Sequence, residues 1–208
     1  FGHKKILFQT KRIPFKYKDK KIGILGIARD ITGLYEIQEK LKKQTYYDEL
    51  TKIFNRKAYN ERIQEKFDLF DRYDTNFTIA MYDIDDFKKI NDTYGHDIGD
   101  KVLVEITNEV KSIIRKTDFL FRVGGEEFVI IFDKISLDES YDIAEKIRIN
   151  ISKMQIIENE KITISMGITQ AIANDNPQSI YERVDKLMYQ SKRNNKNQTT
   201  KGWFLQHN

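Results

Sequence analysis

The chain has 208 residues, enough to bury one or two domains. Its 36 basic and 32 acidic residues leave a net charge of +4, which gives little support to a nucleic-acid partner. It has no cysteine, which excludes disulfides and thiolate metal sites, and no apolar run approaches the roughly 20 residues of a transmembrane helix. We expect a globular cytoplasmic protein. Because the first residue is Phe1 and not Met, we also expect a fragment, which leaves an upstream membrane segment open.

The first part of the chain predicts a strand pair followed by a helix. The strands are expected at about Lys4–Phe15 and Lys21–Asp30. A single hairpin is marginally stable alone, so this pair needs a packing partner. Further on, Leu34, Ile37 and Leu41 have the a/d spacing of a coiled coil. The run covers little more than one heptad, so a lone linker helix and a dimer-forming helix both remain open.

Beyond residue 48 the apolar residues alternate between helical and strand periodicity. Spacings of 4, 4 and 3 predict helices over Tyr59–Phe70, Gly99–Arg115 and Ile143–Met154, and a similar stripe over Ile180–Ser191 predicts the last helix. Strands are predicted at Asn76–Ile84, on both sides of Gly124-Gly125, at Ile162–Thr169 and at Thr199–Leu205. The alternation within Ile162–Thr169 predicts a strand buried on one face only. We interpret the helical stripes as core packing.

The order of these elements predicts an α+β fold. From Asn76 the chain reads strand, helix, strand, strand, helix, strand, the ferredoxin-like βαββαβ pattern, here with a central sheet flanked by helices. In the antiparallel order 4-1-3-2, the end of the first strand lies beside the start of the third. The first strand ends in Asp83 and Asp85, and the third starts with Glu126 and Glu127. The topology therefore brings distant acids together at one edge of the sheet.

The stretch FRVGGEEF, Phe121–Phe128, places paired carboxylates beside strands that look buried. Such acids cost free energy unless they are neutralised, and a divalent metal is a common partner. Mg²⁺ prefers one or two carboxylates together with phosphate oxygens, and Lys88 nearby suits phosphate charge. One alternative is a surface hairpin whose acids face water. A second is that the acids lie at a helix N-terminus, where the helix dipole favours negative charge; this would explain Asp85 or Asp86 but not why they meet Glu126.

The motifs resemble those of a known family. DIDDFKKINDTYGHDIGD at Asp83–Asp100, together with FRVGGEEF, resembles the GGDEF domains, the bacterial diguanylate cyclases. The resemblance extends over about residues 45–197, from DELTKIFNR at Asp48–Arg56 to DKLMYQSKRNNKN at Asp185–Asn197. It implies a ferredoxin-like sheet similar to the palm domains of nucleotide cyclases and polymerases. It also implies that the GGDEF domain spans residues 47–208. GIARDIT at Gly26–Thr32 resembles the C-terminal end of a PAS sensor domain, which makes 1–31 a partial PAS-like segment and 32–46 a signalling helix.

The resemblance also implies roles for individual residues. Two Mg²⁺ ions per active site, or Mn²⁺ in their place, would be held by Asp83, Glu126 and the backbone carbonyl of Ile84. Glu126 would also take the proton of the attacking 3′-hydroxyl, with Lys88 stabilising phosphate charge and Glu127 as a supporting acid. Substrate contacts are implied for Phe87, Asn91, His96, Asp100, Lys192 and Lys196. Asn91 and Asp100 would read guanine, because an Asp can accept from the N1–H and 2-amino donors.

The implied reaction joins two GTP into cyclic di-GMP and two pyrophosphates, in a homodimer with facing half-sites. Arg115 and Asp118 match the family's inhibitory RxxD site for the product. The sequence departs from the family pattern at Lys52, Ser191, Asn195 and Lys196, and the last replaces an arginine, which keeps the charge but loses the bidentate fork. The alternatives are a catalytically silent domain that binds GTP or cyclic di-GMP as a receptor, and a structural regulator without nucleotide affinity.

Overall fold

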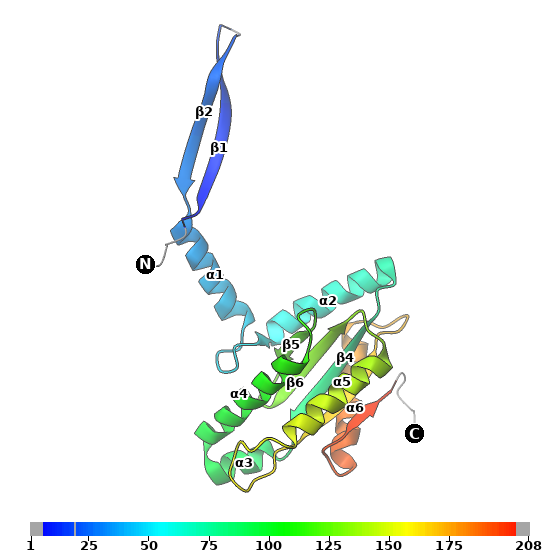
Figure 1. The fold of residues 1–208 in the computed structure, drawn as a ribbon. Coiled ribbons are helices and arrows are strands. Elements are labelled where there is room, and N and C mark those ends of the chain that lie inside the picture. Colours follow the sequence, from blue (N-terminus) through cyan, green and yellow to red (C-terminus); the bar gives the residue numbers. More distant parts are fainter. Residues whose placement is uncertain (1–5, 19, 203–208) are drawn as a thin grey trace. The chain divides into compact units, whose positions relative to one another are not determined.

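The computed structural model describes residues 6–18 and 20–202. They divide into two units, one up to Thr45 and one from Tyr46 onward (Figure 1). Within the described part of the chain, every helix is too short or too polar to cross a membrane.

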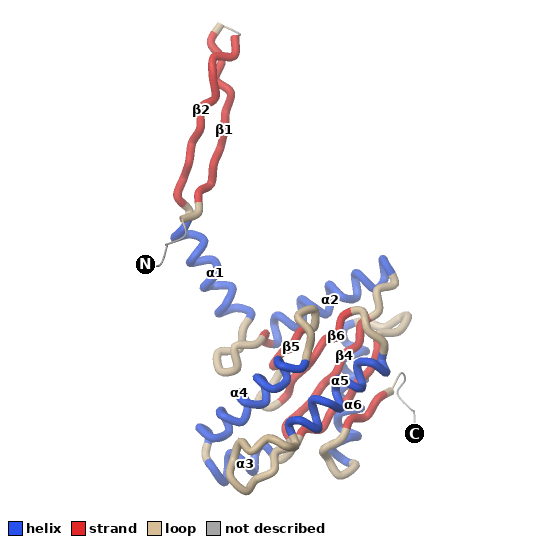
Figure 2. The backbone as a smooth tube through the Cα atoms, viewed as in Figure 1, coloured by secondary structure: helices blue, strands red, loops and turns tan. Residues whose placement is uncertain are grey.

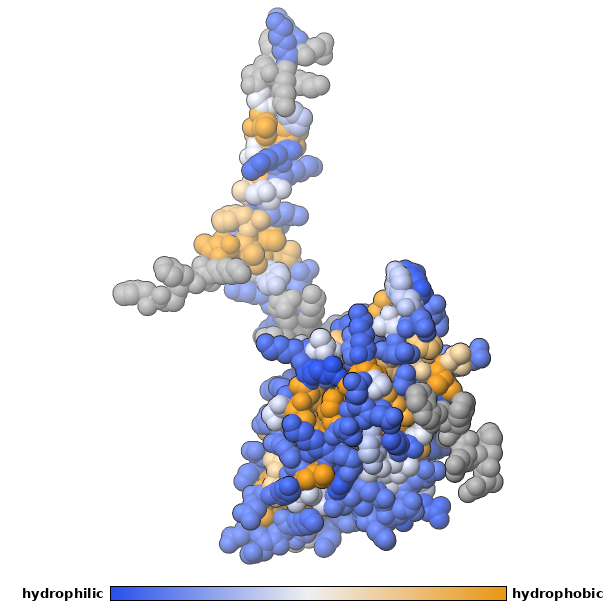
Figure 3. Space-filling model, turned by 45° about the vertical axis from the view of Figure 1, so that its right-hand side comes forward, coloured by the Kyte–Doolittle hydropathy of each residue, from blue (hydrophilic) through white to orange (hydrophobic). Residues whose placement is uncertain are grey.

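The first unit is a strand pair followed by a helix, as predicted. Strands β1 (Phe8–Tyr17) and β2 (Lys20–Asp30) pair antiparallel, and α1 spans Thr32–Tyr46. Apolar side chains gather on the outside of this unit (Figure 3). The coiled-coil positions of α1 are among them, since Leu34, Ile37 and Leu41 are 57%, 60% and 56% exposed.

The second unit contains a six-stranded sheet in the order β3-β5-β6-β4-β7-β8. Its strands β5, β6 and β4 lie side by side in Figure 2. Its strands are β3 (Phe54–Asn55), β4 (Phe77–Ile84), β5 (Phe119–Arg122), β6 (Glu127–Asp133), β7 (Ile164–Gln170) and β8 (Thr199–Lys201). The central four strands, read from β7 to β5, have the predicted antiparallel order 4-1-3-2. The short strands β3 and β8 extend this core in parallel at its two edges.

Helices cover both faces of this sheet. They are α2 (Arg56–Tyr73), α3 (Phe87–Tyr94), α4 (His96–Ile113), α5 (Leu137–Ile151) and α6 (Pro177–Arg193). Successive residues of β4 point to opposite faces, as the pleat requires. Ala80 and Tyr82 pack with α3, α4 and α5, whereas Ile79 and Met81 pack with α2 and α6. All eight residues of β4 are buried, which places the acids at its end beside a dry core.

The prediction that the strand after α5 is buried on one face only is wrong. All seven residues of β7 are buried, because α6 packs on one face of this strand and α5 on the other. The polar side chains that suggested a solvent-facing side have internal partners instead. Ser165 donates a hydrogen bond to Asp85, and Thr169 accepts one from Arg183.

Several other predicted elements have different bounds, and two of them concern the neighbourhood of the acids and the end of the chain. The helix expected at Gly99–Arg115 begins at His96, and a separate short helix, α3, precedes it. Gly95 separates the two helices with φ = +84°, a left-handed conformation that suits glycine. The last strand was expected to reach Leu205, and it ends at Lys201, while residues 203–208 lie outside the described residues.

Candidate active site

The acids of the two motifs meet where β4 ends. Asp83 lies opposite Glu127 of β6 on one side and opposite Ser165 of β7 on the other. The Ile84 N–H also donates to the Glu126 carbonyl oxygen at 3.4 Å. The convergence predicted from the strand order is therefore present.

The glycine pair forms the predicted hairpin between β5 and β6. The Val123 N–H donates to the Glu127 carbonyl oxygen at 2.9 Å, which closes the turn. Neither glycine has a positive φ, however. A Cβ at Gly124 would lie 2.3 Å from Glu127 Oε2, so this glycine makes room for the neighbouring carboxylate. Glu126 and Glu127 are both half-buried at the tip.

Arg122 fixes the position of this hairpin, and the sequence reasoning missed it. Its Nε and Nη2 donate to the Gly125 carbonyl oxygen at 3.0 and 2.8 Å, and its Nη1 donates to Asp48 Oδ1 at 3.0 Å. The residue before Glu126 is thus tied to the segment that enters the domain. Arg122 directly follows the apolar run Phe119–Phe121, and a cation beside a buried strand needs a buried partner. That requirement is the signal in the sequence that could have indicated its structural role.

Asp83 sits in an unfavourable electrostatic environment. It is 5% exposed, and burial together with the charges of Glu126 and Glu127 raises its pKa to about 6. Lys192 opposes that rise, since its Nζ lies 2.7 Å from Asp83 Oδ1 in an ion pair. No aligned hydrogen bond from the described residues reaches this buried oxygen. The site therefore favours an additional positive charge beside Asp83.

Replacing Asp83 by asparagine should stabilise the ligand-free fold by about 1–2 kcal/mol at pH 8. An aspartate with a raised folded pKa loses stability above that pKa and recovers it as pH falls from about 6 toward the ordinary 3.8. The advantage of the variant should therefore vanish at pH 4. Urea unfolding at both pH values measures it. Asp86→Asn, at a carboxylate 58% exposed, is the control and should change little. An equal gain in stability of Asp83→Asn at pH 4 would contradict the raised pKa of Asp83.

Asp85 has a role different from that of Asp83, although both end the same strand. It is 6% exposed and accepts hydrogen bonds from Thr163 Oγ1 and Ser165 Oγ, both at 2.6 Å, and from the Asn197 N–H at 3.1 Å. These three donors satisfy the carboxylate within the protein. Asp85 therefore joins β4, β7 and the loop after α6, and Asp83 remains the acid that can bind a ligand.

The implied guanine-reading residues lie on α3 and α4. The half-buried Asn91 packs against α4 so closely that a Cβ at Gly99 would lie 1.9 Å from Asn91 Oδ1. Asp100, which follows Gly99 on α4, is exposed. The structure thus brings Asn91 beside the helical turn that carries Asp100. Lys88 and His96 are exposed in the first turns of α3 and α4, and Phe87 is buried at the start of α3.

Two lysines near the end of α6, Lys192 in its last turn and Lys196 in the loop after it, face the acids of the DIDD motif. Lys192 pairs with Asp83, and Lys196 Nζ lies 2.6 Å from Asp86 Oδ1. The loop that carries Lys196 is held in an uncommon conformation, with φ of 70°, 59° and 46° at Asn195, Lys196 and Asn197. Both predicted phosphate-binding lysines therefore reach the edge of the sheet where the acids lie.

Residues 45–198 match the family model described as diguanylate cyclase, GGDEF domain. The chain belongs to the GGDEF domain family. It is 32% identical over 189 residues to diguanylate cyclase DgcM of Escherichia coli K12, covering 91% of this chain and 46% of that protein. It is 34% identical over 178 residues to a diguanylate cyclase of Vibrio cholerae, covering 85% of this chain and 56% of that protein. The chain thus spans about half the length of these curated relatives.

Solved structures of GGDEF domains have the same fold as this chain. The coiled coil and GGDEF domain of DgcB from Caulobacter crescentus, in complex with cyclic di-GMP, matches with a TM-score of 0.80 and 28% identity. That match covers 83% of this chain and 93% of the other. The active GGEEF domain of a Vibrio cholerae diguanylate cyclase matches with a TM-score of 0.68 and 33% identity, covering 71% and 96%.

The residues of this GGDEF domain fit a divalent cation. Asp83 and Glu126 offer carboxylates on adjacent segments, and the buried oxygen of Asp83 lacks an aligned donor among the described residues. In the described part of the chain, no three acidic or histidine side chains form a ready cluster. Two carboxylates suffice for Mg²⁺, which fills its shell with waters and phosphate oxygens.

The RxxD residues of this GGDEF domain have unequal exposure. The Arg115 side chain is 47% exposed, whereas that of Asp118 is fully buried. Asp118 Oδ2 accepts the Arg115 N–H at 2.9 Å, and its Oδ1 accepts the Asp133 N–H at 3.3 Å. Asp118 therefore braces the turn before β5, and Arg115 presents its guanidinium to solvent.

Proposed function

We propose that this chain is a diguanylate cyclase that condenses two GTP into cyclic di-GMP and two pyrophosphates. The observation that carries the proposal is the pairing of Asp83 with the GGEE hairpin, with Lys192 and Lys196 at the same edge. Carboxylates suit the metals of a nucleoside triphosphate, and lysines suit its phosphates. Because GTP is a cytoplasmic nucleotide, we place the reaction in the cytoplasm.

In each step the 3′-hydroxyl of one GTP attacks the α-phosphorus of the other, and the bond to the pyrophosphate leaving group breaks. Glu126 takes the hydroxyl proton, with Glu127 beside it. Asp83, Glu126 and the Ile84 carbonyl would hold two Mg²⁺, which supply charge neutralisation of the phosphates and activation of the hydroxyl. Lys88, Lys192 and Lys196 bind phosphate oxygens. Phe87, Asn91, His96 and Asp100 complete the list of substrate contacts, with Asn91 and Asp100 on the guanine edge.

We place one GTP in each domain, so that the active species is a homodimer with facing half-sites. The exposed apolar positions of α1, Leu34, Ile37 and Leu41, support a dimer-forming helix. The strand pair at the start would then be the end of a PAS-like input domain that acts through α1.

Incubating the chain with GTP and Mg²⁺ and separating the nucleotides by chromatography tests the proposal. Cyclic di-GMP should form, at a rate that rises faster than linearly with protein concentration, because two chains share each turnover. GTP or cyclic di-GMP bound without turnover would instead favour a silent receptor. Linear dependence on protein would contradict the dimer requirement.

Gly99→Ala should weaken GTP binding without harming the fold. The new Cβ would displace Asn91, whose amide oxygen would lie 1.9 Å away, while alanine within α4 is intrinsically favoured by up to about 1 kcal/mol. We expect the KM for GTP to rise about tenfold, the loss of one hydrogen bond to the base. Kinetics and thermal unfolding measure the two effects. Thr107→Ala, on the same helix and remote from Asn91, is the control for KM.

We further propose that the product inhibits the enzyme through Arg115. Arg115→Ala should relieve inhibition by cyclic di-GMP and leave the initial rate unchanged. Initial rates at increasing product concentration measure this. Unchanged inhibition would mean that the RKTD sequence serves only as the turn between α4 and β5, with Asp118 as its brace.

A further inference from the structure

The loop that follows α6 and carries Lys196 has an uncommon backbone. Its three consecutive residues Asn195, Lys196 and Asn197 all have a positive φ, of 70°, 59° and 46°. Left-handed backbone is disfavoured for any residue with a Cβ, although asparagine tolerates it better than lysine does. A run of such residues persists only where the surrounding structure holds it in place. The contacts that hold this loop therefore decide where Lys196 lies.

One of these contacts comes from Arg148 on α5. Its Nη1 donates to the carbonyl oxygen of Asn197 at 3.0 Å and to Oδ1 of the same residue at 2.9 Å. Two bonds from one nitrogen, to the backbone and to the side chain, fix both the position and the orientation of Asn197. Because Lys196 directly precedes Asn197, the start of the lysine side chain is fixed as well.

Arg148 is held in turn by Glu145, which lies one helical turn earlier on α5. Its Nε and Nη2 donate to the two carboxylate oxygens of Glu145, each at 2.8 Å, and both side chains are partly buried. Bidentate contacts of this kind are strong and directional. Their hydrogen bonds lower the pKa of Glu145 and raise the pKa of Arg148, so both groups stay charged near neutral pH. The guanidinium thus uses two nitrogens to anchor itself to α5 and the third to hold the loop.

The loop is also held by the segment that follows β4. The Asn197 N–H donates to Asp85 Oδ2 at 3.1 Å, and Lys196 Nζ lies 2.6 Å from Asp86 Oδ1. Asn197 therefore connects Arg148 on α5 with the acids of the DIDD motif. Its neighbour Lys196 reaches those acids because both ends of this connection are in place.

We propose that Arg148 is a positioning residue for the triphosphate of the substrate and that it acts through Lys196. The inference rests on the proposed function, in which Lys196 binds phosphate oxygens. The hydrogen-bond partners of Arg148 in the described part of the chain are Glu145 and Asn197, neither of which is an implied contact of substrate or metal. A lysine on a fixed backbone loses less conformational freedom when its ammonium meets a phosphate. Arg148 therefore strengthens binding of the triphosphate without touching it.

The test is the affinity of the full chain for 3′-deoxy-GTP with Mg²⁺, measured by calorimetry. This probe carries the triphosphate but lacks the attacking 3′-hydroxyl, so no turnover accompanies binding. Arg148→Gln and Lys196→Gln should each raise Kd about fivefold, the loss of one partly exposed charge contact. In the double variant Kd should be the same as in Lys196→Gln alone, because no lysine is left to position.

Two further variants separate positioning from folding. Arg148→Lys keeps a charge beside Glu145 but lacks the fork that reaches Glu145 and Asn197 together. Its affinity for 3′-deoxy-GTP should fall, while its midpoint of thermal unfolding stays close to that of the wild type. Lys146→Gln removes an exposed lysine of α5 and should leave Kd unchanged.

An unchanged Kd in both Arg148 variants would overturn the proposal, and so would an unchanged Kd in Lys196→Gln. Multiplied effects in the double variant would also overturn it, because Arg148 would then act on the fold and not through Lys196. Turnover of GTP by the wild-type chain is measured separately. Its failure would contradict the cyclase proposal, whereas the comparison of Kd values decides the role of Arg148.

Discussion

Glu126→Gln should lower the rate of cyclic di-GMP formation about a thousandfold or more, the range expected when a general base is lost. Glutamine keeps the shape of the side chain but cannot take a proton from the 3′-hydroxyl. It also lacks the charge that would hold a divalent cation together with Asp83. Initial rates with GTP and Mg²⁺ measure the loss.

The fold should tolerate this change. Glu126 is half-buried, and its side chain makes no hydrogen bond or ion pair with other described residues. Its charge contributes to the raised pKa of Asp83, after the larger effect of burial. Glu126→Gln should therefore lower the pKa of Asp83, and the titration of its carboxyl carbon by NMR reports that shift without any turnover.

Glu127→Gln is the matched control at the neighbouring position. Glu127 packs against Gly124 and opens β6, so its loss should reduce activity less, by about tenfold. A larger loss of activity from Glu127→Gln than from Glu126→Gln would make Glu127 the general base and Glu126 the supporting acid. Full activity in Glu126→Gln would remove this residue as both ligand and base.

The sequence was sufficient to predict how the acids meet. Strand and helix periodicities specify the order of the elements, and few sheet topologies are compatible with that order. Once the first and third strands are antiparallel neighbours, the end of one must lie beside the start of the other. The strand order alone therefore places Asp83 opposite the GGEE hairpin, where the structure has it.

The sequence could not distinguish the two acids at the end of β4. Asp83 and Asp85 have the same periodicity and the same neighbours in the chain. Their difference comes from residues about 80 positions or more away: Thr163, Ser165 and Asn197 donate to Asp85, while Lys192 pairs with Asp83. Partners of that kind depend on how β7, α6 and the loop after α6 pack beside the end of β4, and periodicity does not contain this information.

The same limit explains the wrong prediction for β7. Alternating polar residues normally mark a strand with one solvated face. Here the polar side chains have hydrogen-bond partners inside the protein, Asp85 after β4 for Ser165 and Arg183 of α6 for Thr169, and burial then costs little free energy. A pattern of residue types reports polarity, and whether a polar side chain meets water or a buried donor is decided by tertiary packing.

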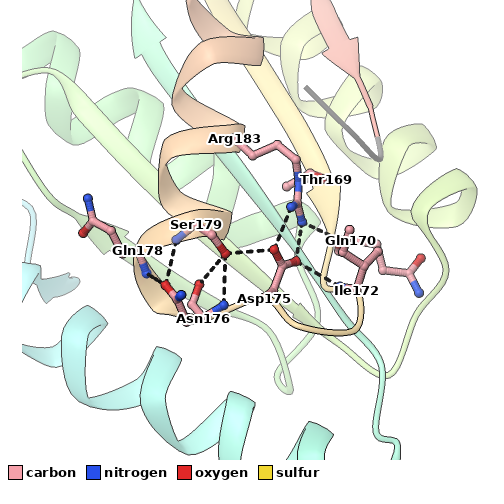
Figure 4. A network of polar contacts seen from close by, with 8 residues as sticks. All are labelled: Thr169, Gln170, Ile172, Asp175, Asn176, Gln178, Ser179 and Arg183. Carbon is pink, nitrogen blue, oxygen red and sulfur yellow. Dashed lines mark hydrogen bonds and ion pairs between the residues drawn. The ribbon is translucent and has the colours of Figure 1, made fainter. Parts of the chain in front are cut away.

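Arg183→Met should destabilise the protein by about 3 kcal/mol or more, because it leaves a buried carboxylate without its main partner. Arg183 and Asp175 are 7% and 6% exposed and form a bidentate pair, with N–O distances of 2.8 and 2.6 Å (Figure 4). Arg183 also donates to Thr169 Oγ1 and to the Gln170 carbonyl oxygen, at 2.8 and 3.0 Å. The network thus attaches α6 to β7, and α6 carries Lys192.

Urea unfolding of Arg183→Met measures this loss, with Arg193→Met as the control. Arg193 is exposed at the end of the same helix, and its replacement should change stability by less than about 0.5 kcal/mol. The double variant Asp175→Asn, Arg183→Met should be less destabilised than the sum of the single changes, since each single change leaves one buried charge unpaired and the double variant leaves none. Additive losses would contradict a coupled pair.

The pH dependence of stability gives a second check on the Arg183–Asp175 ion pair. Burial alone would raise the pKa of Asp175, but hydrogen bonds from Arg183, Ile172 and Ser179 outweigh it and hold the pKa below its ordinary 3.8. A carboxylate with a depressed pKa contributes stability above the unfolded pKa and loses it as pH falls through the folded value. The gap between wild type and Arg183→Met should therefore be largest near neutral pH and narrow as the pH falls into the acid range. A gap that persists in acid would mean that Arg183 acts through packing of its stem and not through its charge.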